Sequence, residues 1–120
     1  MARVTGIGGV FFRARDPEAL AAWYAEHLGI RLEPWGGAVF QAREGDVTVW
    51  NASELSPDYY GAGELGVMLN YRVDDLDAML AQLRAAGVEV LDRVMDEENG
   101  RFGWAVDPEG NRFELWEPRG

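Results

Sequence analysis

Apolar residues recur at helical spacing in two segments of the chain, and capping residues flank each segment. The first segment has Asp16 as its N-cap, Pro17 at its first helical position and Gly29 after its last turn. The second segment begins after Asp75 and ends before Gly87. The apolar positions are Leu20, Trp23, Tyr24 and Leu28 in the first segment, and Leu76, Met79, Leu80 and Leu83 in the second. We therefore predict two amphipathic helices, one in each half of the chain.

Shorter runs of apolar, aromatic and β-branched residues predict β-strands around each helix. These runs are residues 8–14, 30–33, 38–42 and 46–51 in the first half, and residues 66–73, 88–94, 102–106 and 112–116 in the second. Residues 96–100 are expected to form a loop without a role, and residues 107–111 a tight turn in which Pro108 presets φ. Glu114 lies in the middle of the last strand, where a carboxylate is costly unless it has a partner or faces a polar cavity. This position makes Glu114 a candidate functional residue.

The same order of elements occurs twice along the chain. The N-cap aspartates and the terminal glycines of the two predicted helices occupy matching positions. We expect residues 1–120 to form a single domain of two βαβββ modules, at about residues 7–52 and 66–118, joined by a linker at residues 53–65. Each module is too small to bury both faces of its sheet, so the two would join with helices outside and a concave inner face. Such a concave surface is a typical place for a small-molecule ligand.

The composition narrows the class of protein. The chain has 120 residues, enough for one domain with a hydrophobic core. It has no cysteine, which excludes disulfides, thiolate metal sites and cysteine nucleophiles. The formal charge of −10 argues against nucleic acid and anionic membranes as partners. The sequence has no apolar run of about 18 residues and no signal-peptide pattern at its start, so we expect a cytoplasmic protein.

Two sequence motifs carry a family resemblance. They are Y-R-V-D-D-L-D-A at residues 71–78 and D-P-E-G-N-R-F-E-L-W-E-P at residues 107–118. With the repeat, they make the chain, from Gly8 to Pro118, resemble the vicinal oxygen chelate superfamily, which includes glyoxalase I, bleomycin-resistance proteins and extradiol dioxygenases. The resemblance implies an α+β fold in which two βαβββ modules form a cupped mixed sheet with helices on its outer face. It also implies a homodimer.

The resemblance implies where catalytic members of the superfamily would hold a divalent metal. The corresponding positions in this chain are Gly9, Val49, Met68 and Glu114. Only Glu114 offers an oxygen ligand, whereas such metals need three or four oxygen or nitrogen donors within about 2.0–2.6 Å. The single histidine, His27, is in the first predicted helix, on a segment expected to face away from the concave surface. We therefore predict no metal site and no cofactor.

Alternation along the predicted strands indicates which side chains line the concave inner face together with Glu114. These side chains are Phe11, Arg13, Asn51, Met68, Asn70, Arg72, Arg112 and Trp116. A few polar groups among apolar ones are typical of a small-molecule site. In the alternative interpretation Glu114 only pairs with an arginine, and Arg13 and Arg72 extend into solvent at the strand ends.

These patterns leave three functions open. In the first, the protein binds a small organic ligand, planar or aromatic, without metal, as bleomycin-resistance-like proteins do. Tyr59 and Tyr60 of the linker would either stack on that ligand or only cover the junction between the modules. In the second, it is a lyase, isomerase or dioxygenase of the glyoxalase type, with Glu114 as the base in proton transfer. In the third, it is a scaffold or dimerisation module whose concave face is filled by its own side chains.

Overall fold

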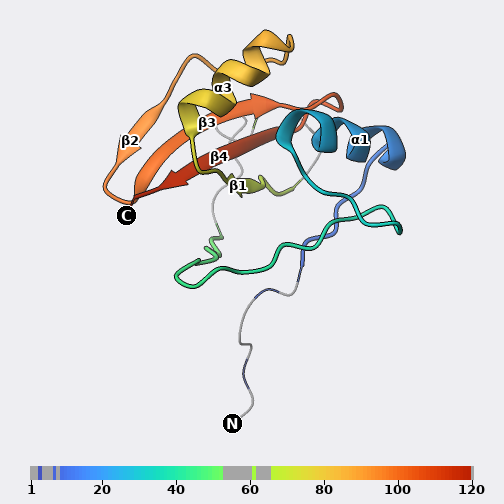
Figure 1. The fold of residues 1–120 in the computed structure, drawn as a ribbon, viewed down its shortest axis with the longest axis horizontal. Coiled ribbons are helices and arrows are strands. Elements are labelled where there is room, and N and C mark those ends of the chain that lie inside the picture. Colours follow the sequence, from blue (N-terminus) through green and yellow to red (C-terminus); the bar gives the residue numbers. More distant parts are fainter. Residues whose placement is uncertain (1–2, 4–6, 8, 53–60, 62–65, 120) are drawn as a thin grey trace.

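The computed structural model describes residues 3, 7, 9–52, 61 and 66–119 of the chain. In chain order its elements are α1 (Pro17–Leu28), β1 (Asn70–Arg72), α3 (Leu76–Ala85), β2 (Met95–Glu97), β3 (Gly100–Val106) and β4 (Arg112–Pro118). The four strands form one mixed sheet in the order β1-β4-β3-β2, in which β1 and β4 are parallel and the other neighbours are antiparallel. Both helices lie on one face of this sheet (Figure 1). The fold is therefore a small α+β structure, as the sequence predicts.

Both helices begin at the predicted capping residues. At the start of α1, the Asp16 side chain accepts a hydrogen bond from the amide of Ala19 at 3.1 Å, and Gly29 follows the helix with a φ of 72°. At the start of α3, the Asp75 side chain accepts from the amide of Ala78 at 3.0 Å. Each cap satisfies an N–H group that has no partner within the helix, and such a cap contributes about 1 kcal/mol.

The helices cover the sheet through one hydrophobic core. Its buried members are Leu20, Tyr24, Leu76, Leu80, Leu83, Ala105, Phe113 and Leu115. Leu76 and Leu83 are fully buried, and burying a side chain of this size contributes about 1.5–3 kcal/mol. Because Phe113 and Leu115 pack into this core, Glu114 between them faces the other side of the sheet. We call that other side, which faces away from the helices, the inner face.

The strands predicted in the first half are wrong for the residues that the structure describes. The segments concerned are residues 9–14, 30–33, 38–42 and 46–51, while residue 8 lies outside the described residues. They are irregular and pair with none of the described strands. An alternating pattern forms a strand only where another strand pairs with its backbone, and these segments instead leave apolar side chains in solvent, with Phe11 93% and Trp50 78% exposed.

Two strands of the second half also differ from the prediction. The strand predicted at residues 66–73 is limited to β1, and the one at residues 88–94 to a single bridge between Val90 and Ala105. Strand β2 begins just after that segment and extends into residues 96–100, which were predicted to form a loop. The acidic residues there suggested a solvated loop, but an edge strand carries charges on its solvent side equally well.

The predicted linker, residues 53–65, lies outside the described residues except for Gly61. Tyr59 and Tyr60 therefore cannot be placed relative to the sheet, and their predicted stacking role is untested. Neither helix in the described part of the chain is long and apolar enough to span a membrane.

Candidate functional site

The inner face of the sheet carries the candidate site. Strand β4 contributes Glu114 and Trp116 to this surface. The register places Asn70 of β1 and Trp104 of β3 opposite Glu114, and Phe102 of β3 opposite Trp116. Adjacent strands therefore bring one carboxylate, one amide and three aromatic rings onto the same side of the sheet.

Glu114 is only 8% exposed and has a polar partner on the neighbouring strand. Asn70 Nδ2 donates to Glu114 Oε1 at 2.7 Å, and the main-chain N–H of Glu114 donates to the carbonyl of Leu69 at 2.9 Å. A hydrogen bond to a carboxylate is stronger than one between neutral groups, so it offsets part of the cost of burying the charge. The amide thus fixes one carboxylate oxygen on the inner face.

Aromatic rings flank this carboxylate. Trp116 stacks on Phe102 with ring centroids 6.1 Å apart and an interplanar angle of 4°, and its Nε1 donates to the carbonyl of Asn99 at 3.0 Å. Trp104 is 1% exposed, and the guanidinium carbon of Arg93 lies 4.6 Å from the centroid of its ring. Parallel rings with a fixed indole form a rigid, flat apolar surface against which another planar group can stack.

Arg72 connects the edge of the sheet to the first half of the chain. Its guanidinium donates to the carbonyl of Val47 at 2.9 Å and lies 3.5 Å from Asp46 Oδ2. Arg43 in turn lies 4.0 Å from the Asp46 carboxylate and 3.4 Å from that of Asp74. Each exposed pair contributes about 1 kcal/mol or less, so their joint effect is to position this segment rather than to hold the fold together. Arg72 is therefore engaged by the first half and does not simply extend into solvent.

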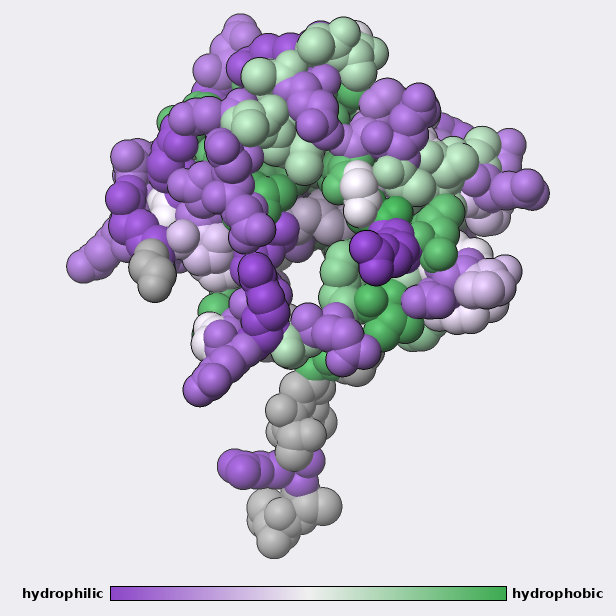
Figure 2. All heavy atoms as spheres, in the orientation of Figure 1, coloured by the Kyte–Doolittle hydropathy of each residue, from purple (hydrophilic) through white to green (hydrophobic). Residues whose placement is uncertain are grey.

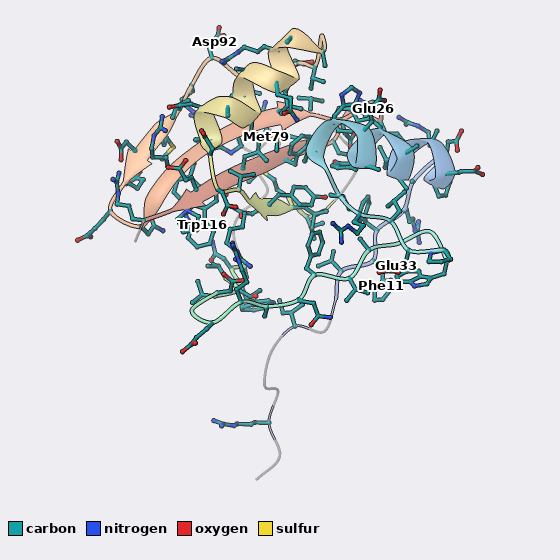
Figure 3. All side chains as sticks on the ribbon, in the orientation of Figure 1. Phe11, Glu26, Glu33, Met79, Asp92 and Trp116 are labelled. Atoms are coloured by element: carbon teal, nitrogen blue, oxygen red, sulfur yellow. The ribbon has the colours of Figure 1, made fainter. Side chains whose placement is uncertain are left out.

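An opening lies on the inner-face side of the molecule. Residues 38–52 run below the sheet, on the side away from the helices (Figure 1). The space-filling view shows a gap between these parts (Figure 2), and Trp116 lies beside it (Figure 3). A ligand in this opening would touch both the inner face and the first half of the chain.

The structure places the predicted site residues in two groups. By strand register, those on the inner face are Asn70, Arg72, Arg112, Glu114 and Trp116. In the irregular first half, the exposed ones are Phe11, Arg13 and Asn51. Met68 is half-buried just before β1. A single surface that unites all of these residues stays a prediction.

The predicted set lacks Phe102 and Trp104. Residues at equal distances from the turn at residues 107–111 face each other across the hairpin, which places Trp104 opposite Glu114. Both aromatic residues could therefore have been found by pairing the two predicted strands, not by treating each strand alone.

The residues at the superfamily's metal positions do not fit a divalent metal. Gly9 and Val49 have no ligating side chain, and the side chain of Val49 lies in solvent. Within the described ranges, no group of three or more histidine, aspartate or glutamate side chains could hold a metal ion. Glu114 and Asn70 together supply fewer donors than a divalent metal requires. A site that works by hydrogen bonding and stacking without a metal stays a prediction.

Comparisons with known proteins agree with this architecture. The sequence matches the family described as Glyoxalase-like domain over residues 9–116. It is similar to TnmS3, an antibiotic binding protein from Streptomyces sp. CB03234, with 25% identity, a TM-score of 0.61 and coverage of 99% of this chain and 100% of that chain. A member of the glyoxalase/bleomycin resistance protein/dioxygenase superfamily from Sphaerobacter thermophilus DSM 20745 is 20% identical, with a TM-score of 0.60 and coverage of 95% and 98%. A comparison with curated proteins gave no match.

The family match spans most of the sequence, and both solved structures are covered over nearly their whole length. The chain therefore belongs to the glyoxalase-like domain family, and its fold is that of the vicinal oxygen chelate superfamily.

Proposed function

We propose that this protein binds a small, planar organic molecule on the inner face of its sheet, without a divalent metal. The observation that carries the proposal is the Asn70–Glu114 hydrogen bond beside the stacked rings of Phe102 and Trp116. The rings would hold the flat body of the ligand, and the carboxylate would accept a hydrogen bond from a hydroxyl or amino group on it. The full-length similarity to an antibiotic binding protein supports a binding role.

The proposal includes two modules, at residues 7–52 and 66–118, and a homodimer. The sequence repeat supports the modules, and the exposed apolar side chains of the first half, with Phe40 and Val49 each 72% exposed, support a second copy that covers them. Phe11 and the other first-half site residues would reach the inner face in that assembly. Light scattering coupled to size-exclusion chromatography tests this assembly, and a mass of one chain at micromolar concentration would contradict it.

A second candidate function is a lyase, isomerase or dioxygenase of the glyoxalase type, in which Glu114 removes a proton from the ligand. The specific observation in its favour is that Asn70 orients this buried carboxylate, since a general base must be held within reach of the proton it takes. A Glu114→Gln variant distinguishes the two functions. It should abolish turnover if Glu114 is the base, and unchanged turnover of any substrate found would remove the enzymatic role.

A thermal-shift screen of planar aromatic compounds, combined with metal analysis of the purified protein, tests the binding role. A true ligand should raise the unfolding midpoint by mass action, and Trp116→Leu should weaken its binding about fivefold because a stacked ring contributes roughly 1 kcal/mol. Trp35→Leu is the matched control, because Trp35 is 69% exposed and is not on the sheet. One nickel, manganese, zinc or iron ion per chain that resists dialysis, or equal effects of both variants, would overturn the proposal.

A further inference from the structure

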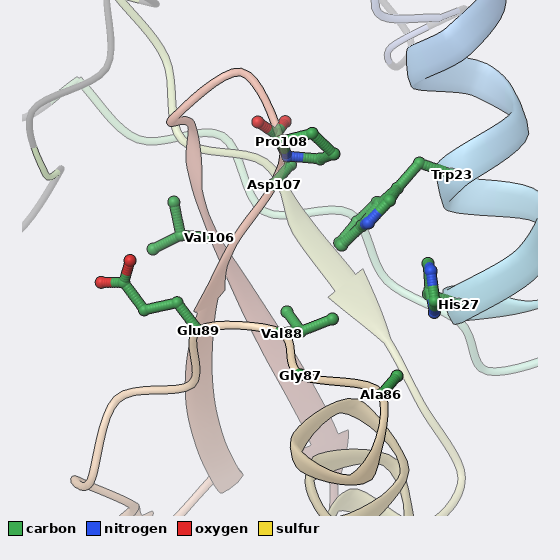
Figure 4. A pocket seen from close by; sticks show the side chains of 9 residues that line it. All are labelled: Trp23, His27, Ala86, Gly87, Val88, Glu89, Val106, Asp107 and Pro108. Carbon is green, nitrogen blue, oxygen red and sulfur yellow. The ribbon is translucent and has the colours of Figure 1, made fainter.

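A cavity of about 290 Å³ lies beside α1, at the end of the sheet that carries the turn between β3 and β4 (Figure 4). It is bounded by α1, by the segment that follows α3 and by the start of the turn between β3 and β4 (Figure 4). Its apolar walls include Trp23, Val88 and Pro108. Trp23 and Val88 also pack against the core between helices and sheet, and Glu114 is not among the residues that line the cavity.

Two rings from α1 form one wall of this cavity. Trp23 and His27 are one helical turn apart, with ring centroids 5.1 Å apart and an interplanar angle of 50°. The indole of Trp23 also makes edge contacts with the rings of Tyr24 and Phe113, with centroid distances of 5.0 Å and 6.2 Å. These contacts fix its orientation. A fixed indole whose remaining surface lines a cavity is a suitable platform for a cation or a flat ring.

The charge around the cavity is negative. Asp107 lines it and is 5% exposed, and its carboxylate accepts hydrogen bonds from Tyr24 Oη, from Asn111 Nδ2 and from the amides of Glu109 and Asn111. All four donors are neutral, and the described residues give Asp107 no ion pair. Glu89 adds a second carboxylate to the lining, which includes no lysine or arginine. A buried carboxylate that is hydrogen-bonded but lacks a counter-charge favours a cation in the adjoining space.

We propose that this cavity binds a small organic cation, with an ammonium group and one flat apolar ring. Its volume of about 290 Å³ lies near the lower limit of ligand sites, which run from about 300 to 1,000 Å³, so the ligand it suits is a small one. The ammonium group would lie near Asp107, and the apolar ring would pack against Trp23 and Val88. The Glu89 carboxylate, which extends away from Trp23 (Figure 4), would act at longer range from the rim. This site is independent of the ligand proposed for the inner face.

Benzylammonium is a suitable probe, and benzyl alcohol is its neutral counterpart. In proton–nitrogen correlation spectra, benzylammonium should shift the indole signal of Trp23 saturably, with a Kd of about 1 mM for so small a ligand. The Trp23 signal is identified by its loss in Trp23→Phe. Glu89→Gln should weaken binding about two- to fivefold, as expected for removal of one partly screened charge, while Glu18→Gln on the exposed face of α1 should not.

Filling the cavity provides a test that does not depend on charge. Ala86 is exposed and lines the cavity, and Ala86→Phe should abolish the shift, whereas Ala81→Phe on the exposed side of α3 should leave it unchanged. Circular dichroism shows that each variant keeps its helices. Three results would each overturn the proposal: equal affinity for benzyl alcohol, a shift confined to the Trp116 signal, or undiminished binding by a folded Ala86→Phe variant.

Discussion

The hydroxyl of Tyr24 donates to Asp107 Oδ2 at 2.8 Å and joins two residues that are 83 positions apart in the sequence. This buried bond connects α1 to the turn between β3 and β4. The same turn holds the start of the helix, because the carboxylate of Glu109 accepts from the amide of Arg15 at 2.7 Å and from that of Asp16 at 3.0 Å. One short turn therefore fixes α1 at two points, and α1 is the first-half element that covers the sheet.

Replacing Tyr24 by phenylalanine should lower the free energy of unfolding by about 1–3 kcal/mol. The ring would keep its contacts with Phe113 and Tyr71, whose ring centroids are each 5.7 Å away. The loss of stability would therefore come from the missing hydroxyl. The buried Asp107 carboxylate would lose one of its donors, and an under-satisfied buried acceptor is costly. Urea denaturation followed by circular dichroism measures the change.

A double-mutant cycle controls this prediction. In an Asp107→Asn background the charge at the acceptor is gone, so Tyr24→Phe should cost less than it does in the natural chain. Equal costs in both backgrounds would show that the hydroxyl acts through some other contact.

Tyr24, which is buried, and Tyr71, which is partly buried, should make the fold sensitive to alkali. Burial raises the pKa of Tyr71 to about 12, and burial together with neighbouring Tyr71 and Asp107 raises the pKa of Tyr24 further. Because an unfolded tyrosine titrates near pH 10, the unfolded chain releases these protons first, and the free energy of unfolding should fall as the pH rises from about 10 towards 12. The raised pKa of Tyr71 alone corresponds to a loss of at most about 3 kcal/mol in the free energy of unfolding.

Urea denaturation at several pH values between about 9 and 11.5 measures this slope. Tyr71→Phe should make the slope shallower. At neutral pH it should lower the free energy of unfolding less than Tyr24→Phe does. A free energy of unfolding that is constant up to pH 11.5 would contradict the prediction, as would tyrosinate absorbance that develops entirely near pH 10 in the folded protein.

The architecture of the second half follows from its sequence more fully than that of the first. The alternation of Phe113 and Leu115 with Glu114 predicts which side of β4 faces the helices, because those two apolar residues can only be buried together. The residues around Phe11 and Val49 show the same kind of pattern without forming strands, since pairing depends on a partner that local sequence does not specify.

The structural role of the turn at residues 107–111 could not be read from its sequence either. Its composition predicts the turn itself, and Gly110 indeed has a φ of 83°. The helix-anchoring roles of Asp107 and Glu109 arise from contacts with residues more than 80 positions away, which turn chemistry alone cannot indicate.

Glu109→Gln should weaken the fold at neutral pH and reduce its sensitivity to acid. The amides of Arg15 and Asp16 donate to the Glu109 carboxylate and hold its pKa below the ordinary value. The stabilisation is present above the unfolded pKa of about 4.3 and is lost as the pH falls through the lower folded value. Denaturation between about pH 3 and 7 should therefore show a shallower acid limb in the variant. Glu18→Gln, which changes an exposed glutamate of α1, is the control, and identical acid limbs in both variants would exclude the proposed anchor.

Gly100→Ala should destabilise the protein more than Gly110→Ala does. Both glycines have a positive φ, 140° at Gly100 and 83° at Gly110, so either alanine strains the backbone by about 1–2 kcal/mol. At Gly110 a new Cβ would meet no other atom within 4 Å, whereas at Gly100 it would collide with the carbonyl of Glu117 and with Trp116 Nε1. The chain would have to shift at the Trp116–Phe102 stack, so the cost at Gly100 should exceed that at Gly110 by about 1–3 kcal/mol. Thermal unfolding of the two variants measures the difference, and equal midpoints would show that the first residue of β3 does not pack tightly against β4.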